Sequence, residues 1–108
     1  MTEWHALTAF QRDLLTAIAA VDDEPYGLAL KAYLDERYPD PINHSRLYQN
    51  LDELDDAGLV TVERQASDKR TNAYRLTDTG RRQLQCQADT LVQVCDRPQA
   101  IADGGGEK

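Results

Sequence analysis

Residues 43–77 read NHSRLYQNLDELDDAGLVTVERQASDKRTNAYRLT, and the spacing of the apolar residues changes partway along this stretch. This change indicates the fold. In the first half of the stretch, leucines recur at helical spacing. Asn43 is a suitable N-cap and Gly58 a suitable left-handed stop, so we predict a helix from Asn43 through Ala57.

The second half of the stretch changes to a period of two. Val60 and Val62 alternate with polar residues, a turn-rich basic segment follows, and Tyr74 and Leu76 continue the alternation. This pattern is typical of a two-stranded hairpin with a polar, basic tip.

Capping signals and apolar stripes predict three further helices, over residues 8–21, about 26–38, and from Thr77 or Asp78 to about Arg97. The order is then helix, helix, helix, hairpin, helix, which is the connectivity of a winged helix-turn-helix. We therefore expect a mainly α fold with a small β-hairpin and a C-terminal dimerisation helix.

A chain of 108 residues forms one folding unit. We expect four segments: an N-terminal arm (1–7), a winged helix-turn-helix DNA-binding domain (8–77), a C-terminal dimerisation helix (78–97) and a flexible tail (98–108). No apolar run reaches the roughly 20 residues of a membrane span, and no secretory signal opens the chain, so we expect a cytoplasmic protein.

The charge is unevenly distributed. The chain carries a net charge of −7, yet residues 64–82 hold six basic and two acidic residues, a net +4 against −11 for the remainder. Binding to a phosphate backbone needs local positive potential, which this basic segment supplies.

The acidic remainder is rich in Asp and poor in Lys, with 13 Asp to 6 Glu and 9 Arg to 3 Lys. Excess short carboxylates keep proteins soluble in concentrated salt, so we predict a high-salt cytoplasm. The alternative is an ordinary acidic protein whose surface happens to be rich in Asp.

The third predicted helix carries the candidate base-reading residues. With Leu47 facing the core, its first two turns expose polar side chains that suit a major groove, since Arg bonds guanine and Gln bonds adenine. These candidates are His44, Ser45, Arg46, Tyr48 and Gln49, with His44 nearest the core edge. The alternative is a solvated outer face that touches no DNA.

The hairpin supplies the candidate phosphate contacts, Arg64, Lys69, Arg70 and Arg75. A basic wing beside such a helix can fix the register on the duplex while the helix reads sequence. The alternative is an edge hairpin that charge protects against aggregation.

The chain resembles the PadR-like winged-helix transcriptional regulators, particularly their haloarchaeal versions, over residues 7–85. The stretches that carry the resemblance are LTAFQRDLL (7–15), EPYGLALK (24–31), NHSRLYQNL (43–51), AGLV (57–60) and DKRTNAYRLTDTGRR (68–82). The resemblance implies a homodimer that binds a palindromic operator on double-stranded DNA and represses or activates transcription. One haloarchaeal member of the family regulates oxidative-stress genes, so a stress-responsive role is a hypothesis for this chain. Gln49 departs from the proline that many relatives have.

The last predicted helix has an apolar seam formed by Leu84, Ala88, Leu91 and Cys95, with Val92 beside it. We interpret the seam as a dimer interface, which would place two recognition helices about 34 Å apart. The alternative is that the seam packs on the first helix of its own chain.

The two cysteines lie on opposite sides of this helix and cannot bridge within one chain. We expect Cys95 to be a buried packing residue, and a redox switch at the outward Cys86 is a further hypothesis. His5 and His44 lack partners at metal-ligand spacing, and no carboxylate pair is singled out, so we expect no catalytic site, metal or cofactor.

The sequence thus predicts a homodimeric, sequence-specific DNA-binding regulator with salt ions at its DNA interface. The rival is a winged-helix protein-interaction module without duplex contact, and an enzyme is a third alternative.

Overall fold

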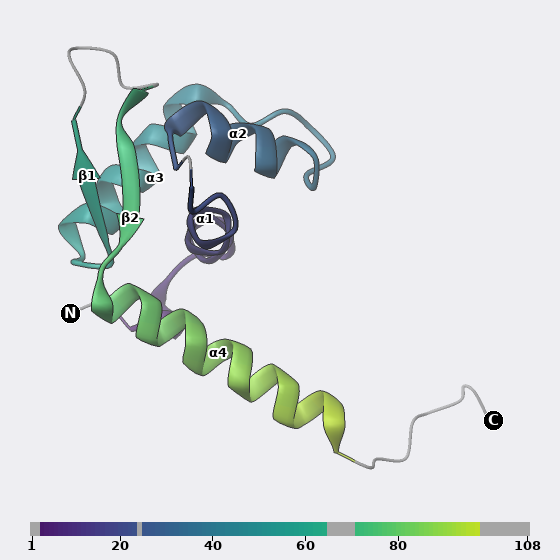
Figure 1. Cartoon of the computed structure of the whole chain (residues 1–108). Coiled ribbons are helices and arrows are strands. Elements are labelled where there is room, and N and C mark those ends of the chain that lie inside the picture. The colour runs from purple at the N-terminus through teal and green to yellow at the C-terminus, as the bar shows by residue number, and fades with distance from the viewer. Residues whose placement is uncertain (1–2, 24, 65–70, 98–108) are drawn as a thin grey trace.

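The computed structural model describes residues 3–23, 25–64 and 71–97. Its elements in chain order are a 3-10 helix η1 (Trp4–Ala6), α1 (Ala9–Ala20), α2 (Gly27–Asp35), α3 (His44–Asp56), β1 (Val60–Glu63), β2 (Ala73–Leu76) and α4 (Asp78–Asp96). This order confirms the predicted winged helix-turn-helix with a C-terminal helix (Figure 1).

The core gathers around α1, which Figure 1 shows nearly end-on with α2, α3 and the hairpin about it. Phe10, Leu14, Leu15 and Ile18 of α1 are buried there. The leucine stripe of α3 faces them, and Tyr74 of β2 joins from the hairpin. The helical and alternating patterns therefore meet in a single apolar cluster.

The predicted capping residues are confirmed. Thr8 and Gln11 form a capping box, in which Thr8 Oγ1 accepts from Gln11 N at 3.1 Å and Gln11 Oε1 accepts from Thr8 N at 3.2 Å. Asn43 caps α3 and Thr77 caps α4. Gly58 ends α3 with a φ of 79°, a conformation that favours glycine.

The hairpin pairs Val60 with Leu76 and Val62 with Tyr74 in antiparallel register. A third segment of the chain, not predicted from the sequence, pairs with β2 beside the hairpin. Tyr26 forms an isolated antiparallel bridge with Ala73, and Tyr74 N donates to the Pro25 carbonyl at 2.9 Å. The segment between α1 and α2 therefore holds the start of β2, at the end of the hairpin where the two strands are joined by their connecting loop.

Helix α2 ends at Asp35, earlier than the predicted residue 38. The carbonyl of Leu34 accepts from both Arg37 N and Tyr38 N, which tightens the chain into a turn before Pro39. Asp35 then holds the next segment, because its Oδ1 accepts from Ile42 N at 2.7 Å. The polypeptide reverses here to begin α3.

The prediction that Tyr48 is exposed is wrong, since only 9% of the residue is accessible. Its ring lies against Gly27 at the start of α2, where a Cβ would come within 2.5 Å of the hydroxyl oxygen and 2.8 Å of the ring. A glycine at 27 is therefore required for the close approach of α2 and α3.

Helix α4 leaves the body as a projecting rod (Figure 1). Of its 19 residues only Gly80 is buried, where a Cβ would lie 2.2 Å from the carbonyl oxygen of Leu59. Cys95 is exposed within this chain, contrary to the expected packing role. The seam is thus largely uncovered: the main contacts of α4 with the body are to α1 and β2, and Ala88, Leu91 and Cys95 are exposed.

In the parts of the chain that the structure describes, no helix has the length and apolar character needed to span a membrane.

Candidate nucleic-acid interface

The first two turns of α3 stand at the surface. His44, Ser45 and Gln49 are exposed and line an open hollow of about 430 Å³, together with Tyr48 and Asp52. The centres of the His44 and Tyr48 rings lie 6.4 Å apart and the rings are tilted by 35°, so the exposed imidazole is a neighbour of the buried tyrosine. This face presents an imidazole, a hydroxyl and an amide, which are groups that can hydrogen-bond base edges.

Arg46 is exposed but leans toward α1 instead of pointing out with Ser45 and Gln49. Its guanidinium carbon lies 3.9 Å from the centre of the Phe10 ring, a cation–π contact. The arginine therefore stands at the flank of the α3 face, where it can meet a phosphate more readily than a base in line with Gln49.

A partly buried aromatic group, Tyr38, supports that flank. The Tyr38 ring packs edge-on against Phe10 with ring centres 5.9 Å apart, and its hydroxyl donates to Asp13. Burial, aided by the Asp13 carboxylate, raises the pKa of Tyr38 to about 12, which nearby Arg46 opposes. Tyr38 is accordingly neutral at ordinary pH and holds Phe10 in place beneath the guanidinium.

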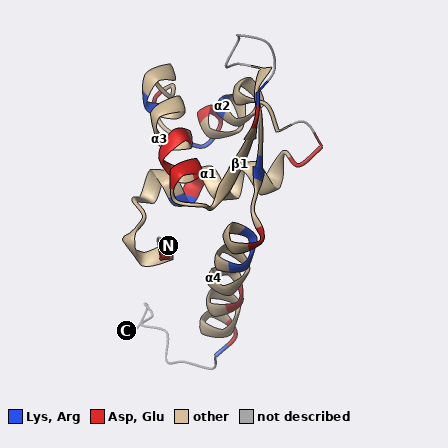
Figure 2. Ribbon diagram, turned by 90° about the vertical axis from the view of Figure 1, so that its left-hand side faces the viewer, with Lys and Arg blue, Asp and Glu red and all other residues tan. Residues whose placement is uncertain are grey.

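The structure describes two of the four candidate residues of the wing, whose strand β1 packs against α3. Arg64 follows β1 and is exposed, and Arg75 is exposed on β2 opposite Thr61. Lys69 and Arg70 lie outside the described residues. Figure 2 shows basic segments along the hairpin.

The wing and α3 share an electrostatic environment. Burial raises the pKa of Tyr74, Asp52 adds to the rise, and Arg64 opposes it. Both charged groups therefore act on one hydroxyl, which puts the end of β1 within electrostatic range of the α3 face.

The turn into α3 is tied down by an ion pair. Lys31 Nζ contacts Asp35 Oδ2 at 2.7 Å, while the other carboxylate oxygen accepts from Ile42 N. The hydrogen bond from Lys31, followed by that from Ile42, lowers the pKa of Asp35 below its usual 3.8. The carboxylate thus stays ionised and fixes the residue that precedes the α3 cap.

One residue of this site, Gln11, was not predicted from the sequence to contact α3. Gln11 was expected only as part of the capping box, yet its amide also reaches Asn50 and Glu53 on α3. Its early position in an N-terminal capping motif gave no signal of that second contact.

The α4 seam forms the other prominent surface. Leu91 is 53% exposed and Val92 is 58% exposed, and both lie near the far end of the helix. Between α4 and the body runs a hollow of about 600 Å³, lined by Trp4, Ala9, Arg12, Asp13, Thr16, Leu84, Gln87, Ala88 and Leu91. Three of the predicted dimer-interface residues therefore share one groove.

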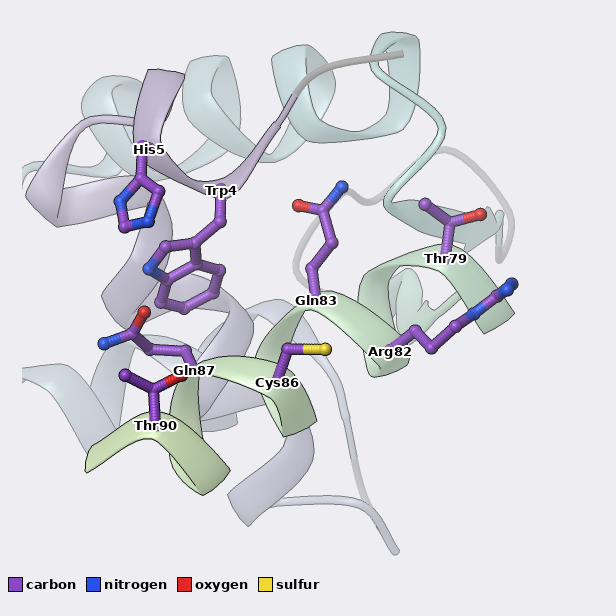
Figure 3. A pocket seen from close by; sticks show the side chains of 8 residues that line it. All are labelled: Trp4, His5, Thr79, Arg82, Gln83, Cys86, Gln87 and Thr90. Atoms are coloured by element: carbon purple, nitrogen blue, oxygen red, sulfur yellow. The ribbon is translucent and has the colours of Figure 1, made fainter. Parts of the chain in front are cut away.

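A further hollow of about 430 Å³ lies between η1 and α4 (Figure 3). It is lined by Trp4, His5, Thr79, Arg82, Gln83, Cys86, Gln87 and Thr90. Cys86 is exposed and lines this hollow. Within residues 3–23, 25–64 and 71–97, no three His, Cys, Asp or Glu side chains are grouped as metal ligands would be.

Comparison with solved structures places the fold among transcription regulators. RosR of H. salinarum matches with a TM-score of 0.70 at 41% identity, over 90% of this chain and 82% of that one. A complex structure of the same RosR matches with a TM-score of 0.75 at 38% identity, over 94% and 85%.

A mutant of MarR from E. coli, complexed with operator DNA, matches with a TM-score of 0.60 at 26% identity, over 80% of this chain and 56% of that one. No curated protein matches the sequence.

Residues 15–86 match the transcriptional regulator PadR-like family, which covers α2, α3, the hairpin and the first half of α4. The family consists of DNA-binding regulators and not of enzymes. This chain therefore belongs to the PadR-like family of transcriptional regulators.

Proposed function

We propose that this protein is a homodimer that binds a palindromic operator in a high-salt cytoplasm, with the start of α3 in the major groove. The observation that carries the proposal is the exposed polar face of His44, Ser45 and Gln49 beside a hairpin bearing Arg64 and Arg75. Polar side chains on the leading end of such a helix read base edges, while a basic wing fixes the register.

The residues divide into two roles. His44, Ser45 and Gln49 contact bases, because their side chains share the outward face. Arg46 contacts a phosphate, because its stack on Phe10 directs it toward α1. Tyr48 supports the face from beneath. Arg64 and Arg75 bind the backbone, and Lys69 and Arg70 are assigned the same role from their sequence positions.

The test begins by selecting a duplex from a random library in molar KCl. Gln49→Ala should lower affinity for the selected duplex about tenfold, with little effect on a scrambled duplex, since a bidentate base contact discriminates by ~1–3 kcal/mol. Arg46→Ala and Arg75→Ala should lower the affinity for the selected and the scrambled duplex by the same factor.

The matched control is Arg97→Ala, which removes one exposed positive charge at the end of α4. If Gln49→Ala and Arg75→Ala bind the duplexes with the same affinities as this control, the proposed DNA interface is wrong. The rival, a protein-interaction module, gains if no duplex is selected at all.

The homodimer is proposed to form through α4, paired antiparallel with its copy. The seam positions are symmetric about their centre, so Leu84 would face the partner's Cys95 and Ala88 would face the partner's Leu91. Each pair joins a large side chain to a small one, which suits close helix packing. Exposed Leu91 and Val92 support this assignment, because a regulator of this size rarely leaves such a patch uncovered.

Native cysteines test the orientation. In the antiparallel pair the two Cys95 residues lie about 17 Å apart along the helices, too far for a disulfide. Oxidised protein should therefore give no covalent dimer through Cys95, whereas Ala88→Cys with Leu91→Cys should cross-link readily. Leu91→Asp should dissociate the dimer in sedimentation, and Gln93→Asp, which adds the same charge on the opposite face, should not.

The acidic surface supports the high-salt assignment, as does the similarity to RosR of H. salinarum. We further propose that carboxylates near the interface retain cations when DNA binds. Affinity should then fall only weakly as KCl rises, and a steep fall like that of ordinary repressors would contradict this. Genome-wide occupancy in the native host, with and without oxidant, tests the stress-responsive role.

A further inference from the structure

One side chain joins the start of α1 to the middle of α3. Gln11 Nε2 donates to Asn50 Oδ1 at 3.1 Å and to Glu53 Oε1 at 2.8 Å. Its Oε1 accepts from Thr8 N in the capping box. Only 8% of Gln11 is exposed, so its amide reaches from the buried side of α1 to the partly buried Asn50 and the exposed Glu53.

Only glutamine satisfies all three partners. Two amide hydrogens serve two acceptors on α3, and the amide oxygen serves one donor at the α1 N-cap. A glutamate at this position would lose both donors and face the Glu53 carboxylate. A residue such as methionine would fill the space but make none of the three hydrogen bonds.

The connection continues to the reading face. Asn50, fixed by Gln11, donates through Nδ2 to the carbonyl of Arg46 at 2.8 Å, one turn earlier on α3. Arg46 in turn rests on Phe10, the residue adjacent to Gln11. Two neighbouring residues of α1 therefore hold the flank of α3 at three successive points, Arg46, Asn50 and Glu53.

We propose that Gln11 is a positioning residue for DNA recognition: by clasping Asn50 and Glu53 it sets the angle at which α3 presents Ser45 and Gln49. This inference rests on the proposed function. It also gives Glu53 a definite role as an acceptor for the Gln11 amide. A loosened α3 would still meet phosphates, but it would lose the register on which base contacts depend.

The test compares Gln11→Glu, Glu53→Gln and the double variant by the ratio of affinities for the selected and scrambled duplexes. Gln11→Glu should lower that ratio about tenfold, since hydrogen bonds to a charged group are lost and two carboxylates are opposed. The double variant restores a donor at residue 53 for the acceptor at 11, and its ratio should return toward that of the wild type.

Gln11→Met is the second variant, which lowers the ratio without adding charge and which Glu53→Gln cannot rescue. The control is Gln85→Glu, which removes a similar Gln–carboxylate hydrogen bond (Gln85 Nε2 to Asp89 Oδ1, 2.9 Å) and adds the same charge on α4. Thermal unfolding identifies the temperature at which every variant is folded.

The outcomes are distinct. If the wild type selects no duplex, the proposed function fails. If the wild type discriminates and the Gln11 variants, though less stable, keep the full ratio, then Gln11 only stabilises the fold and the positioning role is overturned. A fall in the ratio with rescue by the double variant supports it.

Discussion

Helices α3 and α4 have the same kind of amphipathic sequence but different surroundings. In α3 the leucines are fully buried and both flanks have partners, Phe10 on one side and Gly27 on the other. In α4 only Gly80 is buried, and its apolar seam faces solvent. An apolar stripe on a helix therefore requires a packing partner, but the stripe alone does not determine whether that partner lies in the same chain.

The largest loss of stability is expected when a leucine in the apolar stripe of α3, rather than of α4, is replaced by alanine. Leu51→Ala in α3 should destabilise the fold by about 3 kcal/mol at every protein concentration, because it leaves a cavity in a packed core. Leu91→Ala in α4 should cost less than about 0.5 kcal/mol in dilute protein. At high concentration its cost should rise as the dimer forms, and thermal unfolding across a dilution series measures this. If Leu91→Ala lowers the free energy of unfolding by the same amount at every protein concentration, the α4 stripe packs within its own chain and not in a dimer.

The next prediction concerns the stability lost when alanine replaces the glycine that ends α3 or the glycine in the first turn of α4. Gly80→Ala should cost about 2 kcal/mol, because the added Cβ meets the Leu59 carbonyl and α4 must shift. Gly58→Ala should cost about 1 kcal/mol, since its surroundings are open and only the positive φ is strained. Urea unfolding of both variants checks the order, and equal costs would show that α4 is not anchored at Gly80.

Removing the N-cap side chains of α4 and α3 should lower the free energy of unfolding by amounts that differ less. Thr77→Ala should cost about 1.5 kcal/mol, because its hydroxyl accepts from Gly80 N and also donates to the Gly58 carbonyl at 2.7 Å. Asn43→Ala, which removes one capping bond to Arg46 N, should cost about 1 kcal/mol. Amide hydrogen exchange should show fraying in the first turn of the affected helix alone.

The smallest effect concerns pH. The pKa of Asp35 is lowered in the folded state, so its contribution is present above pH 3.8 and is lost as pH falls through the lower folded value. Acidification should therefore loosen the start of α3, where Asp35 holds Ile42, before it affects the start of α4. NMR shifts of Ile42 and Gly80 amides during an acid titration test this, and simultaneous changes would contradict it.

Much of this arrangement could be predicted from the sequence, since caps and periods are local signals. Thr8, Asn43 and Gly58 each act within one turn, and the change of period at Val60 needs only its neighbours. The flanks of α3 could not be predicted. Arg46 and Tyr48 are placed symmetrically about Leu47 on a helical wheel, and the positions of α1 and α2 decide that the tyrosine is buried while the arginine stacks on Phe10.

The contact between Gly27 and Tyr48 restricts how this protein can change over generations. Any side chain at 27 collides with the ring, while a smaller residue at 48 first opens a void between the two helices. Each single exchange therefore costs stability, and the effects of changing the two residues are expected to be non-additive. The spacing between the two helices of the helix-turn-helix thus depends on both residues together.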